Sequence, residues 1–358
     1  MPLTMGYAPA HFSARTHARP DFAFGSLGGR FVLMAFLPEP GPARDFAARA
    51  LAAGHHLFDD LTWTAFGVIR DAADFERQTP LLPGLRYFHD PEGEIARHFA
   101  QEAGPGVTVP QWVLLDPALR ILSSWPIDQA EAAFAAIRYH NDVETHAGVP
   151  QHAPVLIVPR IFEPDFCREL IEVYRSDGGR VSGVMRDVGG RTVGVVDNFK
   201  KRRDATINDE GLKGRIQSMI RARLLPEIAR AFMFRATRME RYIVARYDAA
   251  DGGYFRAHRD NTTLATAHRQ FACSINLNAE EFDGGDLRFP EFGRRTYRPP
   301  TGGAVIFSCA LLHEATPVTR GSRFAFLPFF YDDASAGIRE KNQAFLDQSH
   351  TAQATEAA

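Results

Sequence analysis

The 358-residue sequence contains little cysteine, and this scarcity excludes a disulfide framework. Its three cysteines, Cys167, Cys273 and Cys309, are widely spaced and form no Cys-x-x-Cys pair. Small disulfide-stabilised domains need more cysteines at closer spacing. The cysteine content is typical of a protein in a reducing compartment, so we expect a cytoplasmic location.

Long apolar runs and an excess of charge of one sign are also missing. The first twenty residues contain no run of seven apolar residues, and no segment approaches the length that spans a bilayer. The 41 Lys and Arg residues nearly balance the 43 Asp and Glu residues. We therefore expect a soluble protein with neither a membrane nor a nucleic acid as its partner.

The length of the chain predicts two domains. Residues 1–138 have the strand–helix–strand pattern of an α/β domain. Its expected strands cover residues 30–37, 63–70 and two segments around the Asp116-Pro117 turn, and its expected helices cover residues 43–53, 91–101 and 129–137. Residues 139–153 show little apolar periodicity and are expected to form a linker.

The second domain is expected to cover residues 154–333 and to have an α+β fold. It begins with a strand that leads into a helix whose apolar face carries Phe166 and Leu170, and a second helix is expected over residues 209–231. From Met239 onward, short alternating strands are separated by Gly, Pro and Asn turns, as in a β-sandwich or barrel. The Ala-rich tail, residues 334–358, is expected to be weakly structured.

The segment Tyr254–Asn261 places His258 two positions before Asp260. A His-x-Asp pair is expected about once by chance in a chain of this composition, and His140-Asn-Asp142 in the linker is a second one. The flanking sequence distinguishes them. Alternating strands follow His258-x-Asp260, and a third candidate ligand, His313, lies at the end of one strand, whereas no strand surrounds the linker pair, to which we assign no metal.

Two imidazoles and one carboxylate, from His258, Asp260 and His313, could form a facial triad that leaves three cis positions open on octahedral Fe(II). If a 2-oxoglutarate dianion chelates the metal, the charges of Fe(II), Asp260 and the dianion sum to −1. Arg323, at the start of the next strand, would bring the sum to zero. A guanidinium suits this role because its planar fork binds a carboxylate bidentately.

Three motifs together resemble the iron(II)- and 2-oxoglutarate-dependent oxygenases, in particular the prolyl 4-hydroxylase-like branch. They are "RYDAADGGYFRAHRDN", "LNAEEFDGGDLRFPE" and "PPTGGAVIFSCALLHEATPVTRGSRFAF". The resemblance covers residues 154–333 and implies a double-stranded β-helix (jelly roll) with flanking helices. It implies His258, Asp260 and His313 as iron ligands, Arg323 as the co-substrate anchor, and Fe(II), 2-oxoglutarate and O2 as cofactor and co-substrates. Ascorbate is a further candidate.

The same resemblance gives roles to three other residues. Tyr247 matches a tyrosine that faces the co-substrate or substrate pocket, although ordinary aromatic packing is an equal alternative. For Tyr254, core packing and ligand contact are both open. Asn276 occupies a position where some relatives place a tyrosine on the co-substrate, so it is a candidate for that contact. Because Asp260 is a carboxylate, hydroxylation is favoured over halogenation.

The basic run Lys200–Arg203, in "KKRRD", allows two interpretations. A solvated charge cluster is the simpler one. The other is a segment over the active site that attracts an acidic group of the substrate.

The N-terminal part, about residues 18–137, resembles the peroxiredoxin and thioredoxin-like fold through "RPDFAF", "GGRFVLMAFLPEPGPARDF" and "VPQWVLLDPALRI". The positions of the peroxiredoxin threonine and cysteine are Pro42 and Asp45 here, and no cysteine precedes Cys167. Peroxide reduction is therefore excluded, because it needs a thiolate. The resemblance also implies a cis peptide bond at Val109-Pro110. A docking module and a dimerisation surface both stay open.

We expect a dioxygenase that hydroxylates an unactivated C–H bond while 2-oxoglutarate is decarboxylated to succinate and CO2. The alternative is a non-catalytic sensor or docking protein that binds iron and 2-oxoglutarate. A peptidyl prolyl-type side chain and a small molecule are both candidate substrates. The sequence does not choose between a monomer and a homo-oligomer.

Overall fold

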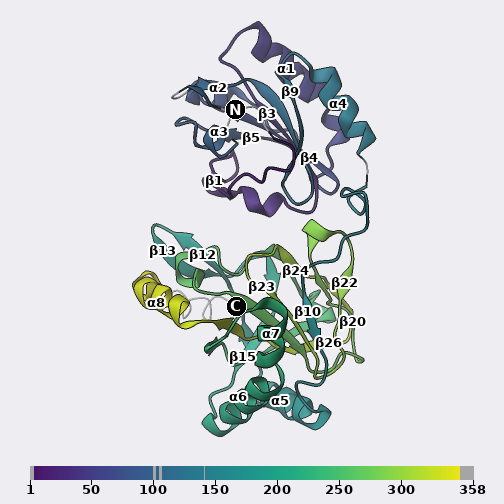
Figure 1. The fold of residues 1–358 in the computed structure, drawn as a ribbon, viewed down its shortest axis with the longest axis vertical. Coiled ribbons are helices and arrows are strands. Elements are labelled where there is room, and N and C mark those ends of the chain that lie inside the picture. The colour runs from purple at the N-terminus through teal and green to yellow at the C-terminus, as the bar shows by residue number, and fades with distance from the viewer. Residues whose placement is uncertain (1–3, 100–101, 105–106, 141, 347–358) are drawn as a thin grey trace. The chain divides into compact units, whose positions relative to one another are not determined.

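The computed structural model describes residues 4–99, 102–104, 107–140 and 142–346 (Figure 1). The chain forms two compact units, Met1–Ala153 with Pro290–Arg294, and Pro154–Phe289 with Arg295–Ala358. Each unit has its own buried hydrophobic clusters. Within the described ranges, no helix combines the length and the apolar character that crossing a membrane requires.

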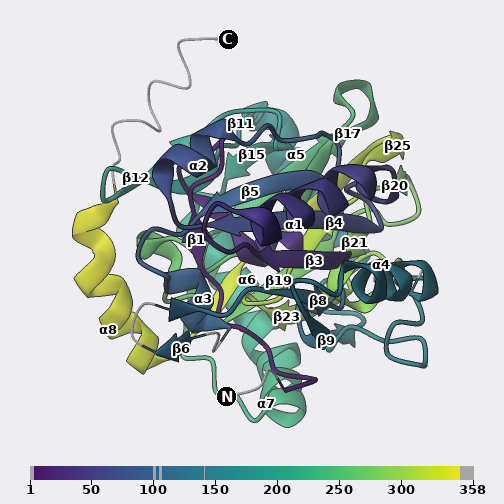
Figure 2. The same cartoon turned by 90° about the horizontal axis from the view of Figure 1, so that it is seen from above.

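The first unit contains a five-stranded mixed sheet in the order β5-β4-β3-β8-β9 (Figure 2). Its strands are β3 (Phe31–Phe36), β4 (Trp63–Ile69), β5 (Leu85–His89), β8 (Gln111–Leu115) and β9 (Ile121–Pro126). β3, β4 and β5 are parallel, whereas β8 and β9 are antiparallel to their neighbours. Two short ribbons, β1 (Ser13–Ala14) with β2 (Phe22–Ala23) and β6 (Glu102–Gly104) with β7 (Val107–Thr108), lie outside this sheet.

Helices cover both faces of this sheet, which explains why β3 is an unbroken apolar run. α1 (Pro42–Ala53) and α4 (Ala130–Tyr139) pack on one face, and α3 (Glu94–His98) with the 3-10 helix η1 (Phe24–Leu27) packs on the other (Figure 1). All six residues of β3 are buried. The strand–helix–strand unit expected over residues 30–70 is present as β3, α1 and β4.

The structure adds elements that the sequence pattern did not indicate. α2 (Ala72–Arg77) and β5 lie between β4 and α3, and η2 (His55–Leu57) follows α1. α2 is only six residues long, so apolar periodicity hardly identifies it; Asp71 caps it by accepting a hydrogen bond from the Asp74 backbone N–H. The predicted cis bond at Val109-Pro110 is wrong, since within the described residues the cis peptide bond is Leu82–Pro83. The trans form is the favoured one for an X–Pro bond when packing does not select the cis form.

The second unit contains two antiparallel sheets. The larger runs β10-β23-β19-β26-β17-β15-β11 and the smaller runs β14-β18-β24-β21-β22. The larger sheet consists of β10 (Leu156–Val158), β23 (Ala304–Ser308), β19 (Phe271–Asn276), β26 (Ser322–Phe326), β17 (Ile243–Asp248), β15 (Arg203–Thr206) and β11 (Arg180–Val181), with β16 (Arg238–Glu240) and β27 (Phe329–Tyr331) at its side. The smaller consists of β14 (Lys200–Lys201), β18 (Tyr254–His258), β24 (His313–Ala315), β21 (Leu287–Arg288) and β22 (Thr296–Tyr297).

The chain alternates between these sheets as it runs from β17 through β18, β19, β21, β23 and β24 to β26. This winding is that of the expected jelly roll. Two further ribbons accompany it, β12 (Val184–Val188) with β13 (Arg191–Val195), and β20 (Asp283–Gly284) with β25 (Val318–Arg320). Short 3-10 turns, η3 (Ala249–Asp251), η4 (Leu264–Thr266) and η5 (Pro290–Phe292), connect strands.

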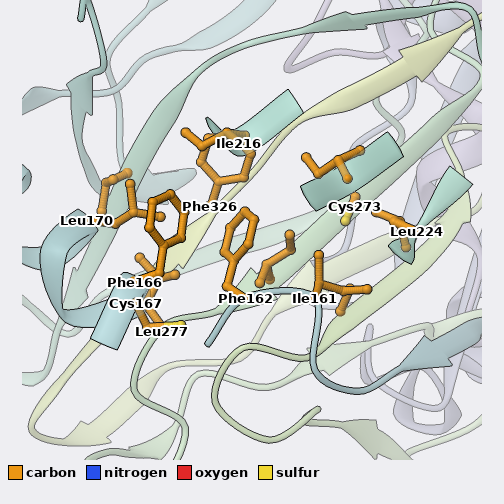
Figure 3. Close-up of a cluster of buried hydrophobic side chains, with 14 of the residues drawn as sticks. Ile161, Phe162, Phe166, Cys167, Leu170, Ile216, Leu224, Cys273, Leu277 and Phe326 are labelled. Carbon is orange, nitrogen blue, oxygen red and sulfur yellow. The ribbon is translucent and has the colours of Figure 1, made fainter. Parts of the chain in front are cut away.

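Three helices cover the outer face of the larger sheet. α5 (Pro164–Asp177), α6 (Glu210–Arg223) and α7 (Leu225–Phe232) share one buried cluster with its strands, and Figure 3 shows Phe162, Leu170 and Phe326 within this cluster. On β19, Cys273 and Ile275 point into the same cluster. Because side chains alternate across a strand, Ser274 and Asn276 face the other way, toward the barrel interior.

Two sequence predictions for this unit need correction. The single helix predicted over residues 209–231 is two helices, because α6 ends before Leu224 and Pro226 lies in the first turn of α7. The predicted weak structure after Ala334 is also wrong for residues 334–345, which form α8 (Asp333–Asn342) and η6 (Gln343–Phe345). Asp332 caps α8, and the Ser335 hydroxyl accepts a hydrogen bond from the Gln270 amide.

Glu240 links three parts of the second unit. It accepts hydrogen bonds from His268 at 3.0 Å and from Arg269 at 2.6 Å, and Arg339 of α8 lies 3.5 Å away. Burial alone would raise the pKa of Glu240, but the hydrogen bond from His268 and the charge of Arg269 outweigh it and lower the pKa to about 2. At pH values above 4.5, its ordinary pKa, the ionised carboxylate therefore stabilises the fold. This contribution is lost as the pH falls toward 2.

We predict that Glu240→Gln lowers the free energy of unfolding at pH 7 by about 3 kcal/mol. The difference from wild type should shrink steadily between pH 4.5 and pH 2, as measured by urea unfolding. Glu172→Gln, which removes an exposed pair with Arg175, is the control and should change stability by less than about 0.5 kcal/mol. A Glu240 effect that is independent of pH would contradict this assignment.

Candidate metal centre

The two candidate histidine ligands are cross-strand partners. His258 ends β18 and pairs directly with His313, which begins β24, and their ring centroids are 4.3 Å apart. Asp260 follows β18, and its backbone N–H donates to the Cys309 carbonyl at 3.0 Å. The Asp260 carboxylate oxygens lie 3.5 Å from His258 Nε2 and 3.3 Å from His313 Nε2. One potential ligand atom from each of these three residues therefore lies within 4.8 Å of the others.

Hydrogen bonds orient both imidazoles. His258 Nδ1 lies 2.7 Å from the Arg256 carbonyl oxygen, and His313 Nδ1 lies 3.1 Å from that of Leu311. A proton on each Nδ1 makes it the donor and leaves the Nε2 lone pair toward Asp260, which is how metal-binding histidines are normally held. Burial and the neighbouring His313 lower the pKa of His258 to about 4, so its ring stays neutral near pH 7.

The Asp260 carboxylate remains ionised. Burial would raise its pKa, but the attraction of His313 and the hydrogen bond with His258 outweigh burial and hold the pKa well below the usual range. Two imidazole nitrogens and one carboxylate are a donor set that fits ferrous iron with open positions. His313 is buried, and the rings of Phe307 and Phe289 pack beside it at 4.5 and 6.2 Å.

Arg323 lies on β26 of the larger sheet, in register with Tyr247 on β17. It is 3 % exposed, and its Nη2 donates to Ser274 Oγ at 2.7 Å and its Nε to Asn276 Oδ1 at 3.2 Å. Its guanidinium carbon is 5.3 Å from the centre of the Tyr247 ring. None of these partners is a carboxylate, and the salt bridges of the described residues do not include Arg323. A buried guanidinium held by neutral groups fits the distal carboxylate of 2-oxoglutarate.

The other candidate residues are placed as follows. Tyr247 is buried beside Arg323, and its hydroxyl accepts a hydrogen bond from Arg202 Nη1 at 3.3 Å. The Asn276 side chain contacts Arg323 and donates to the Pro299 carbonyl, so it orients the arginine. Tyr254 donates to the Asn198 carbonyl and is only partly buried. Asp142 accepts hydrogen bonds from Glu144 N–H and the Thr145 hydroxyl, which is the local bonding of a turn.

The simpler interpretation of the basic run, a solvated cluster, is wrong for two of its members. Lys200 and Arg202 are each 7 % exposed, whereas Lys201 and Arg203 are exposed. β14 pairs Lys200 with Phe255, and the Lys200 ammonium lies 4.8 Å from the centre of that ring. The Phe255 ring in turn stacks on His258 with 3.5 Å between centroids. Lys200 and an iron-ligand candidate therefore contact the same aromatic ring.

Ser274 and Phe255 were missed as site residues, and Arg202 was considered only as one member of the basic run Lys200–Arg203. Ser274 could have been found, because it alternates in phase with Asn276 on a strand whose other face is apolar. The run "KKRR" gives no such signal, since four consecutive cations hide which two are buried. Phe255 could have been recognised only from the pairing of β18 with β14.

Comparison with known proteins finds a family match over the region that contains this candidate site. Residues 242–331 match the 2OG-Fe(II) oxygenase superfamily. This range includes all three triad residues and Arg323. The name of this superfamily states its dependence on Fe(II) and 2-oxoglutarate. The chain has a His-Asp-His triad that could hold a metal ion.

The curated relatives are PKHD-type hydroxylases. That of Acidovorax ebreus (strain TPSY) is 34% identical over 109 residues, which are 28% of this chain and 48% of the relative. That of Paracoccus denitrificans (strain Pd 1222) is 45% identical over 88 residues, 22% of this chain and 38% of the relative. The chain thus spans about half the length of these relatives or less.

Solved prolyl hydroxylase structures are also similar. The Trichoplax adhaerens enzyme, solved with a hypoxia inducible factor peptide, has a TM-score of 0.42 and 18% identity over 56% of this chain and 92% of that one. A Pseudomonas putida prolyl-4-hydroxylase has a TM-score of 0.38 and 20% identity over 50% of this chain and 92% of that one.

We predict that His313→Ala weakens Fe(II) binding by roughly 100-fold or more, because one of three ligands is lost. Anaerobic titration with Fe(II), with metal content measured after desalting, would test this. The control variant His140→Ala, which changes the other His-x-Asp pair, should bind as wild type does. Equal binding by the His313 and His140 variants would contradict the triad.

We predict that Arg323→Gln raises the dissociation constant of 2-oxoglutarate by roughly 30-fold or more, since losing one partner of a buried charged pair costs about 2–5 kcal/mol. Calorimetry with Fe(II)-loaded protein under argon would measure it. Arg320→Gln removes an exposed cation three residues away, paired with Asp283, and is the matched control. An unchanged constant for Arg323→Gln would exclude its role as anchor.

Proposed function

We propose that residues 154–333 form an Fe(II)- and 2-oxoglutarate-dependent dioxygenase domain that hydroxylates an unactivated C–H bond. The observation that carries the proposal is the combination of His258, Asp260 and His313, with both Nε2 atoms directed at one carboxylate, and a buried Arg323 without a carboxylate partner among the described residues. One group of residues suits the metal and the other suits the co-substrate.

When bound, Fe(II) with 2-oxoglutarate supplies the oxidising chemistry, so that O2 provides one oxygen atom to the product and one to succinate, with release of CO2. The protein's own residues hold and shield the reactants. His258, Asp260 and His313 would bind the metal, and Arg323 would bind the distal carboxylate. Ser274 and Asn276 hold Arg323 in place. Phe289 and Phe307 restrict water beside His313.

Charge supports this division of roles. Fe(II) with ionised Asp260 and the 2-oxoglutarate dianion leaves one negative charge, and the guanidinium of Arg323 compensates it. The Tyr247 hydroxyl accepts from Arg202, so its own proton is available for a carboxylate oxygen. A peptidyl side chain and a small molecule are both candidate substrates, and ascorbate is a candidate reductant.

For residues 1–138 we propose a thioredoxin- or peroxiredoxin-like fold that works without redox chemistry as a docking module. The sheet order β5-β4-β3-β8-β9, with α1 following β3, supports this fold. Asp45 lies in the first turn of α1, where the resemblance places a catalytic cysteine. Residues 139–153 would be the linker, and a cytoplasmic location stays a prediction.

The proposal predicts release of succinate from 2-oxoglutarate by Fe(II)-loaded protein, stimulated by the true substrate. Mass spectrometry of candidate substrates and cell lysate should find a product heavier by about 16 Da, one oxygen atom. His313→Ala should make neither succinate nor this product. Tight binding of iron and 2-oxoglutarate with no succinate under any condition would instead identify a sensor.

A further inference from the structure

The segment Lys200–Thr206 crosses between the two sheets of the second unit. Lys200 and Lys201 form β14 at the edge of the smaller sheet, and β15 joins the larger sheet beside β17. Arg202 lies between the two strands. The segment therefore connects β18, which carries His258, to β17, which carries Tyr247.

Three cations of this region lie near a single carboxylate, that of Asp204. Arg202 makes a two-point contact with Asp204, at 2.7 Å from both Nε and Nη2, and Arg241 lies 3.5 Å from the same carboxylate. Lys200 is the third cation. Its ammonium donates to Ser182 Oγ at 2.6 Å and to the Gly183 carbonyl at 2.8 Å, and the salt bridges of the described residues do not include it.

This arrangement is electrostatically incomplete. Buried lysines are normally paired with a carboxylate, because a buried charge without one is costly. Asp204 can compensate only one of the three cations. Iron, 2-oxoglutarate, Asp260 and Arg323 already sum to zero, so the proposed co-substrate complex leaves this excess in place. Binding of an anion beside these cations would reduce this excess of positive charge.

The cations lie beside the reaction site. The Phe255 ring contacts both Lys200 and His258, and the guanidinium carbon of Arg202 is 5.9 Å from the same ring. Lys200 and Arg241 both lie within electrostatic range of Asp260. Burial, and then the charge of Arg202, lowers the pKa of Lys200 well below its ordinary value, because both disfavour the charged form more than Asp204 and Asp260 favour it.

We propose that Lys200, Arg202 and Arg241 form a substrate subsite that binds a carboxylate, so that the hydroxylated substrate is an acid. The inference rests on the proposed function and narrows its substrate class. The carboxylate would come from a free organic acid or from an acidic residue of a peptide. The reacting C–H bond would lie at the metal, and the carboxylate at Lys200.

The test uses the full-length protein with Fe(II) and saturating 2-oxoglutarate under argon, so that the co-substrate site is filled and no turnover occurs. Calorimetry compares two matched pairs of probes, hexanoate with hexanamide, and acetyl-Ala-Glu-Ala-amide with acetyl-Ala-Gln-Ala-amide. We expect the acid of at least one pair to bind about tenfold or more tightly than its amide. The pair that shows the preference identifies the source of the carboxylate. Equal or undetectable binding within both pairs overturns the inference.

Lys200→Gln and Lys201→Gln are the matched variants, since their side chains occupy opposite faces of β14. We expect Lys200→Gln to lose about tenfold in acid binding, and Lys201→Gln to match wild type. Lys200→Gln should melt at an equal or higher temperature, because an uncompensated buried cation is removed. A large fall in its melting temperature would assign Lys200 a structural role and overturn the inference. A larger effect on 2-oxoglutarate binding than on acid binding would do the same.

The succinate assay on the same wild-type preparation separates this inference from the proposed function. Succinate release without any acid preference overturns only the carboxylate subsite. Absence of both iron binding and succinate overturns the dioxygenase proposal itself.

Discussion

The in-register pairing of His258 with His313 across β18 and β24 is the constraint on which the rest of the candidate site depends. A slip of one residue would turn one imidazole to the opposite face of the smaller sheet. The irregularity between Phe255 and His258 lies next to this pair, and the bond from Asp260 N–H to the Cys309 carbonyl fixes the carboxylate beside it. Three ligand atoms thus meet because the backbone hydrogen bonds of one short ladder hold them there.

The second organising feature is the excess of cations around the barrel. Arg323, Arg202 and Lys200 are all buried, and hydroxyl, amide or carbonyl oxygens hold Arg323 and Lys200. Such groups orient a cation without cancelling its charge. The interior is therefore electrostatically complementary to anions before any anion binds. This is the preorganisation that a site for acidic reactants requires.

The sequence was sufficient for the parts that depend on local pattern. The triad and Arg323 could be predicted because strand alternation and a fixed order of motifs identify them. The burial of Lys200 could not, because it depends on the pairing of Lys200 with Phe255, 55 positions later in the chain, and on the hydroxyl of Ser182. α8 escaped prediction for a similar reason, since Gln270 and Glu240, both distant in sequence, hold it in place.

Tyr247 has two guanidinium groups near its ring, Arg323 at 5.3 Å and Arg202 at 5.8 Å. Neither arginine can distinguish one carboxylate from another by charge, so the two acids proposed above would compete for neighbouring binding positions of similar character. Discrimination must then come from the other end of each molecule. An acid with a second pair of oxygens that can chelate iron would bind with its carboxylate at Arg323. An acid without such oxygens would gain no extra affinity at that position. The metal, rather than the arginines, would determine which of the two positions each acid occupies.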